Sequence, residues 1–157
     1  PEYLKDASVG EGEVNFWDLG PELTRPARSL KLWITLQVMG SDAMSAMIDH
    51  GYELAETAEE TLRSLPDWEI VSPAAQAVIN FRYAPAGMSG RALDELNQRI
   101  SREICASGFA QVLTTELNGK KVLRICALNP ATTREDMVET VKLLDRCARE
   151  AVGRMSA

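Results

Sequence analysis

The dipeptide Asn118-Gly119 constrains the fold of this chain more than any other local feature. It separates two β-rich runs, 111–117 and 120–128. Asn-Gly favours the type I′ turn, whose positive φ angles match the twist of two paired strands. A turn of two residues also fixes which residues of the two strands lie opposite each other. We therefore expect an antiparallel β-hairpin that the rest of the chain has to cover.

Arg124 is the candidate binding residue of this hairpin. The register predicts Leu113 opposite Arg124 and Glu116 opposite Lys121, with Val122 on the same face as Arg124. An arginine among apolar neighbours needs an anionic partner, and its planar guanidinium suits a carboxylate. Two interpretations stay open: the partner is a bound carboxylate, or it is a helix carboxylate in a structural ion pair.

Helices and two further strands are predicted around the hairpin. Strands are expected at 68–71 and 77–83, joined by a turn at Ser72-Pro73. Thr132 to Glu135 has the form of a capping box before the last helix. Apolar residues recur at helical spacing in four segments: Leu30, Trp33, Ile34 and Val38; Met44, Met47, Ile48, Leu54, Ala55, Ala58 and Leu62; Leu93, Leu96, Ile100 and Ile104; Met137, Val141, Leu144, Ala148 and Ala151. This order predicts an α/β fold with a small antiparallel sheet covered by helices.

Residues 1–24 show neither a helical nor a strand period, and we expect a long loop there. Such a loop is either a functional lid or a frayed terminus held by Trp17. Tyr3 is either a proton donor or a packing residue. The chain begins at Pro1 without a methionine, which suggests a fragment, a nicked product or a processed subunit.

Composition narrows the class of protein. The chain has 157 residues, enough for one domain with a real core. Its net charge of −6 argues against a nucleic-acid partner, and no apolar run approaches the roughly 20 residues of a membrane span. Cys105, Cys126 and Cys147 lack CxxC spacing, and His50 is the single histidine. We therefore expect a cytoplasmic protein with reduced cysteines and no metal site.

Three segments resemble the group II pyridoxal-phosphate (PLP)-dependent amino-acid decarboxylases, above all the bacterial relatives of the aromatic amino-acid decarboxylases. Pro1–Lys5 resembles the start of their mobile catalytic loop, and Leu23–Trp33 resembles the RRFRSLKLW-like segment that leads into their C-terminal domain. Lys121–Thr133 is similar to their VLRFxxxNPxTT strand and turn. The resemblance implies a catalytic loop and connection in residues 1–24. Residues 25–157 would then form the C-terminal small domain of a fold type I PLP enzyme.

The resemblance also implies site residues. Tyr3 matches the loop tyrosine that returns a proton to the substrate carbon after CO2 leaves. Thr24 matches the position whose backbone helps to hold the cofactor phosphate across the dimer interface, and Arg25 would add positive charge there. Arg124 matches an arginine near the substrate carboxylate or the mouth of the site. Pro26 and the next residue stand where many relatives have Arg-Phe, so the packing of this segment is expected to differ.

The activity implied by the resemblance needs more than this chain. The family's Schiff-base lysine lies in an Asn-x-His-Lys motif in which no lysine of this chain stands. The implied partners are the N-terminal portion of the same enzyme, a homodimer partner and a small amino-acid substrate. The implied reaction removes the α-carboxylate as CO2 and gives an amine, with Phe16 and Trp17 hinting at an aromatic substrate. Two alternatives stay open: a stand-alone binding or oligomerisation module, and part of another fold type I PLP lyase.

Overall fold

A computed structural model describes residues 27–155. The chain divides into two compact units, residues 1–41 and 42–157, which are described separately. The described part of the first unit contains helix α1, Arg28–Met39, which ends at Gly40 with a φ of 83°. The elements that follow are α2 (Ser41–Arg63), β1 (Trp68–Ala75), β2 (Val78–Tyr83), α3 (Gly90–Ala106), β3 (Leu113–Leu117), β4 (Lys120–Cys126) and α4 (Arg134–Met155). No helix among the described residues is long and apolar enough to cross a membrane.

The four strands form one antiparallel sheet in the order β1-β2-β4-β3. Asn118 and Gly119 have φ values of 52° and 68°, as the predicted type I′ turn requires. Leu113 pairs with Arg124 and Glu116 with Lys121, so the predicted register is confirmed.

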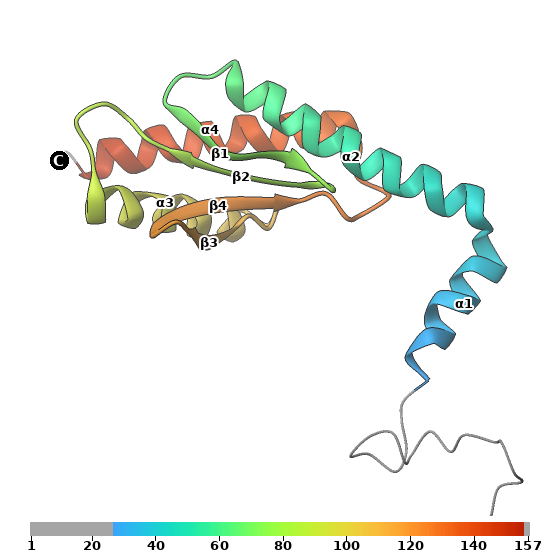
Figure 1. Ribbon diagram of the computed structural model, residues 1–157. Helices are drawn as coiled ribbons and strands as arrows, with labels where there is room; N and C mark the ends of the chain where they lie inside the picture. The colour runs from blue at the N-terminus through green and yellow to red at the C-terminus, as the bar shows by residue number, and fades with distance from the viewer. Residues whose placement is uncertain (1–26, 156–157) are drawn as a thin grey trace, which may run out of the picture. The chain divides into compact units, whose positions relative to one another are not determined.

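The helices α2, α3 and α4 cover one face of this sheet (Figure 1). Alternation along β2 directs Ile79 and Phe81 into the core between sheet and helices, with Leu123 and Ile125 of β4 beside them. Asn80 pairs with Arg124 and therefore lies on the opposite face of the sheet. The α/β fold predicted from the order of elements is confirmed.

Gly51 allows α2 to pass close to the sheet. A Cβ atom at this position would lie 2.8 Å from the backbone oxygen of Ala127 and 3.2 Å from the Cβ of Ala77. The Ala127 N–H donates to the Ala77 oxygen over 2.8 Å, so these two residues are already fixed to each other. The absence of a side chain at Gly51 thus sets the distance between helix and sheet.

The turn predicted at Ser72-Pro73 is wrong. Both residues lie inside β1, where the pairing with β2 shifts between Ile70 and Ser72 and again between Ser72 and Ala75. Because β1 is an edge strand, it tolerates a proline that has no N–H to donate. The chain turns instead at Gln76 and Ala77, with φ values of 50° and 62°.

The capping box before α4 lies one residue later than predicted. Asp136 Oδ2 accepts from the Thr133 backbone N–H over 2.9 Å, and the Asp136 N–H donates to Thr133 Oγ1 over 3.1 Å. These reciprocal bonds satisfy donors at the helix start. Thr132 and Glu135, the predicted pair, take no part in them.

Most predicted apolar positions are buried, with two exceptions. The predicted faces of α3 and α4 are buried in full. In α2 burial begins at Gly51, and Met44, Met47 and Ile48 do not belong to the core, contrary to the prediction. No residue of α1 is buried.

Candidate functional site

Arg124 lies on the sheet face that α2, α3 and α4 leave open, and a neighbour in β2 orients it. Its Nε–H donates to Asn80 Oδ1 over 2.9 Å, across the β2–β4 pair. Arg124 is half-buried and Asn80 is buried. On the same face, Val122 is fully buried before Arg124 and Cys126 is exposed after it. The sheet register therefore holds the guanidinium at a fixed place with one of its donors already used.

The remaining N–H donors of Arg124 have no carboxylate acceptor within residues 27–155. The bond to Asn80 is the one polar side-chain contact of Arg124 in this range. The interpretation of Arg124 as half of a structural ion pair thus finds no partner in the described part of the chain. Its two terminal nitrogens have the geometry to bind a carboxylate through parallel hydrogen bonds.

Arg82, and not Arg124, forms the structural ion pair that one interpretation assigned to Arg124. Its Nε lies 3.9 Å from Glu69 Oε2, and its Nη2 lies 3.8 Å from Asp94 Oδ1. The residue is 4% exposed, and its buried Nε has no hydrogen-bond partner. A buried arginine between two carboxylates is held by charge within the domain, so Arg82 is not free to bind an anion. Sequence reasoning missed this role. Arg82 lies two residues after Asn80 in β2, so both side chains lie on the same face of the sheet.

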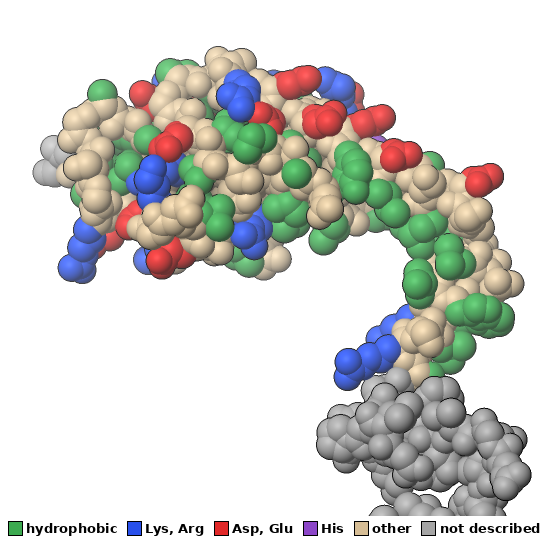
Figure 2. Space-filling model, viewed as in Figure 1, with side chains coloured by type: hydrophobic (Ala, Val, Ile, Leu, Met, Phe, Trp, Pro, Cys, Tyr) green, Lys and Arg blue, Asp and Glu red, His purple; other side chains and the backbone are tan. Residues whose placement is uncertain are grey.

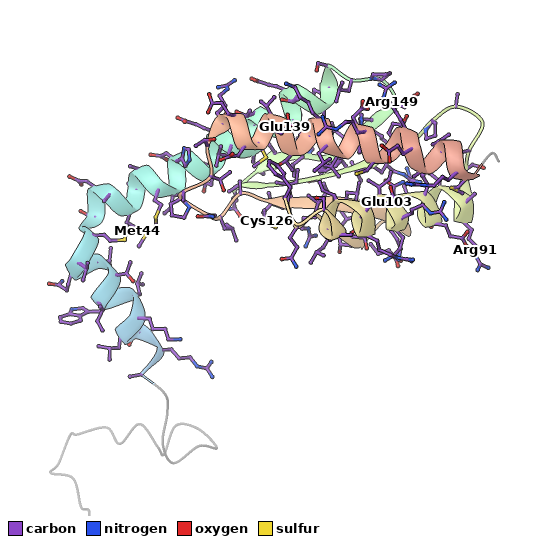
Figure 3. All side chains as sticks on the ribbon, turned by 180° about the vertical axis from the view of Figure 1, so that it is seen from behind. Met44, Arg91, Glu103, Cys126, Glu139 and Arg149 are labelled. Atoms are coloured by element: carbon purple, nitrogen blue, oxygen red, sulfur yellow. The ribbon has the colours of Figure 1, made fainter. Side chains whose placement is uncertain are left out.

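A cavity of about 360 Å3 opens near Cys126, between the start of α4 and the segment after α3. Figure 3 shows Cys126 toward one end of the sheet and Arg91 at the other end of the unit. The cavity walls include Phe109, Leu128 and Asp136, and no lysine or arginine lines it. Two hydrogen bonds from Thr133 lower the pKa of Asp136, which keeps that wall anionic. The cavity is therefore unsuited to a carboxylate ligand.

His50 has a hydrogen-bond partner in the backbone. Its Nε2 lies 2.8 Å from the backbone oxygen of Thr132, which ties α2 to the loop before α4. Within residues 27–155 no group of three or more His, Cys, Asp or Glu side chains is arranged to hold a metal.

The other predicted site residues, Tyr3, Thr24 and Arg25, lie outside the described residues. The described part offers no obvious lysine for a covalently held cofactor: Lys120 pairs with Glu69 over 3.5 Å and Lys121 bonds Gln98 over 2.9 Å. Lys31 and Lys142 are exposed. Residues 27–155 by themselves therefore show no buried lysine that could hold PLP.

Sequence comparison finds relatives among named decarboxylases, although no protein-family model matches the chain. The chain is 41% identical over 152 residues to an aromatic-L-amino-acid decarboxylase of Bacillus atrophaeus, covering 96% of this chain and 32% of the relative. It is 33% identical over 156 residues to tryptophan decarboxylase 2 of Oryza sativa, covering 99% and 31%. It is 34% identical over 140 residues to a phenylacetaldehyde synthase of Arabidopsis thaliana, covering 88% and 28%. The chain thus spans about a third of the length of these relatives.

Solved structures share the fold. The crystal structure of Oryza sativa TDC with PLP and tryptamine superposes with a TM-score of 0.79 at 26% identity, covering 96% of this chain and 32% of that one. The Catharanthus roseus tryptophan decarboxylase matches with a TM-score of 0.76 at 24% identity, covering 94% and 31%. The sheet and its helices are those of the C-terminal domain of these enzymes. By sequence and fold, the chain belongs to the PLP-dependent group II amino-acid decarboxylases and corresponds to their C-terminal part.

Proposed function

We propose that this chain is the C-terminal part of a PLP-dependent carboxy-lyase that removes the α-carboxylate of an aromatic or related L-amino acid as CO2 and leaves an amine. The observation that carries the proposal is the 41% identity over 152 residues to a relative named aromatic-L-amino-acid decarboxylase. The names of further relatives, tryptophan decarboxylase 2 and tyrosine decarboxylase 2, support the aromatic class of substrate.

Arg124 is proposed to bind the substrate carboxylate or to line the mouth of the site. Asn80 holds its Nε–H, and no carboxylate within residues 27–155 competes for its terminal nitrogens. A contact of this kind is strongest before bond cleavage, because the carboxylate loses its negative charge as it becomes CO2. It therefore contributes to binding more than to the rate of the chemical step.

Residues 1–24 are proposed to form the catalytic loop, and residues 25–157 the small domain. The phenol of Tyr3 would return a proton to the substrate carbon after CO2 has left, and the closed loop would exclude water. The backbone of Thr24, with the charge of Arg25 beside it, would contact the cofactor phosphate. PLP, when bound, supplies the electron sink of the reaction, while the protein supplies orientation and electrostatics.

The proposed partners follow from the share of the relatives that this chain spans. The lysine that holds PLP would come from a portion that precedes this region in the relatives, and a second copy would complete a homodimer. We further propose that the enzyme works in the cytoplasm, in keeping with the spacing of its cysteines.

A chimera tests the proposal. This chain would replace the corresponding C-terminal third of the Bacillus atrophaeus relative, and the purified chimera would be given a panel of L-amino acids. We expect CO2 and an amine from tryptophan, tyrosine or phenylalanine, and much less from aspartate or lysine. A folded, PLP-loaded chimera that releases no CO2 from any amino acid would contradict the proposal.

A second candidate function is the formation of an aldehyde, in which an aromatic L-amino acid, O2 and water would give the aldehyde, CO2, ammonia and hydrogen peroxide. The 34% identity to a relative named phenylacetaldehyde synthase favours it. The same panel separates the two, because an aldehyde product reacts with a carbonyl reagent and an amine does not. We expect the amine.

A further inference from the structure

Helix α1 carries apolar side chains on two opposite faces. At 100° per residue the two faces are centred roughly 165° apart around the helix axis. The first, called the Leu30 face, consists of Leu30, Ile34 and Val38. The second, called the Leu36 face, consists of Leu32, Leu36 and Met39. Arg28, Lys31 and Thr35 lie between them on one side. Trp33, which is 59% exposed, lies between them on the other side and joins them into one broad apolar arc. Figure 2 shows hydrophobic side chains along both edges of α1.

All six of these side chains are at least 36% exposed, and no residue of α1 is buried. Helix α4 differs: its large apolar residues Met137, Val141 and Leu144 follow one face, and all three are buried. A helix packed on one surface needs one apolar face a little over 100° wide. A helix that is apolar on opposite sides is suited to burial between two surfaces.

The comparisons supply a candidate for the polypeptide that covers α1. The match to Oryza sativa TDC covers 96% of this chain but only 32% of that one, so about two thirds of the enzyme's polypeptide lies outside the matched region. A second copy of this chain would not suffice by itself. In a twofold pair of α1 helices the same face of each helix meets its mate, which leaves the other face uncovered.

We propose that α1 is a middle layer in the assembled enzyme, with the Leu30 face and the Leu36 face packed on two different apolar surfaces of the portion that this chain does not span. The inference rests on the proposed function, because it requires the remainder of a decarboxylase. It deepens that function by assigning α1 the contact that joins the small domain to the catalytic portion.

The test uses the chimera with the Bacillus atrophaeus relative. One variant carries Leu30→Ala and Ile34→Ala, a second carries Leu32→Ala and Leu36→Ala, and a control carries Lys31→Ala and Thr35→Ala. Truncating buried leucines lowers stability, whereas truncating exposed residues does not. We expect both apolar variants to lower the melting temperature by several degrees, on the order of 4 °C or more, and the control to leave it unchanged.

Hydrogen exchange supplies a second measurement on the unaltered chimera. Amides of α1 should exchange at least about a thousandfold more slowly than in an unpacked helix. Fast exchange, or a melting temperature that responds to one face alone, would overturn the two-sided packing. Should a double variant not fold, Ile34→Val replaces the first double variant and Leu36→Val the second. These milder truncations should also lower the melting temperature.

The outcomes separate this inference from the proposed function. An inactive chimera in which both faces of α1 affect stability would refute the decarboxylase activity and retain the packing of α1. An active chimera in which neither face affects stability would retain the decarboxylase activity and refute the packing of α1. Self-association through α1 that depends on protein concentration would identify a second copy as the occupant and contradict the proposal.

Discussion

At the scale of single residues, Arg124 is the side chain whose function can be tested most directly. In the chimera, Arg124→Ala should raise KM for the amino-acid substrate by about tenfold or more, because a charged hydrogen bond contributes roughly 1.5–3 kcal/mol. The turnover number should change less, since the contact weakens as the carboxylate loses its charge on becoming CO2. Steady-state kinetics across the substrate panel measures both parameters.

The matched control for Arg124 is Lys120→Ala, which removes an exposed charge from the same strand. Lys120 pairs with Glu69, so its loss should leave KM unchanged. Asn80→Ala should raise KM less than Arg124→Ala, because it loosens the guanidinium without removing it. An unchanged KM in Arg124→Ala would make Arg124 a structural residue.

Gly51 gives a second prediction at this scale. Gly51→Ala should destabilise the folded chain by about 1–3 kcal/mol, because the new Cβ would lie 2.8 Å from the Ala127 backbone oxygen. Gly153→Ala is the control: a Cβ atom there would meet no atom within 4 Å, and the substitution should stabilise α4 by about 0.5–1 kcal/mol through helix propensity. Urea unfolding of both variants measures the difference, and equal effects would refute the close approach of α2 to the sheet.

At the scale of secondary-structure elements, the start of α4 distinguishes the predicted cap from the observed one. Thr133→Ala should cost about 1 kcal/mol of stability, since Thr133 Oγ1 accepts from the Asp136 N–H. Thr132→Ala should cost little, because its contact with His50 uses the backbone oxygen, which the substitution keeps. Thermal unfolding measures the stability of both variants. A larger loss of stability in Thr132→Ala would favour the capping box predicted from the sequence, Thr132 with Glu135.

Glu59 links α2 to β1 and makes stability depend on pH. Its carboxylate accepts the Ala74 N–H over 2.6 Å, and this bond, aided by Arg63, holds the pKa of Glu59 below its ordinary value of 4.5. A lowered folded-state pKa stabilises the fold above pH 4.5, and that contribution disappears as the pH falls below this value. Glu59→Gln should therefore lower the free energy of unfolding at pH 7. As the pH falls, this variant should lose less additional stability than the unaltered chain.

The control for Glu59 is Glu60→Gln. Glu60 is exposed and makes one ion pair, with Arg134 over 3.4 Å, so this substitution should keep the pH dependence of the unaltered chain. Unfolding curves between pH 3 and 7 measure the stability of all three proteins. Identical curves for the unaltered chain and Glu59→Gln would contradict the assigned role.

The sequence predicts elements well where local chemistry decides them. Asn118-Gly119 admits essentially one tight turn, which brings Arg124 opposite Leu113 as expected. Prediction from the sequence fails where contacts between distant elements determine the structure. Pro73 has the character of a turn residue, but it lies within β1, an edge strand that accommodates it. The bond from Arg124 to Asn80 also escaped prediction, because it depends on which strand lies next to β4.

At the scale of the whole molecule, the two units should behave differently in solution. Residues 42–157 contain the sheet, its three helices and the buried core, whereas α1 exposes apolar side chains. The complete chain by itself should therefore self-associate and bind a hydrophobic dye, and a polypeptide of residues 42–157 should do so much less. Light scattering and dye fluorescence measure this difference, and equal behaviour of the two would show that α1 is not the cause.

The claim that this chain acts as the C-terminal part of a decarboxylase is tested most directly by CO2 release from a carboxyl-labelled aromatic L-amino acid. The chimera would be compared with the Bacillus atrophaeus relative truncated at the same position. We predict that the chimera releases labelled CO2 in many turnovers per active site and that the truncated protein releases none. A folded chimera that binds PLP and aromatic amino acids yet releases no labelled CO2 would contradict the assignment.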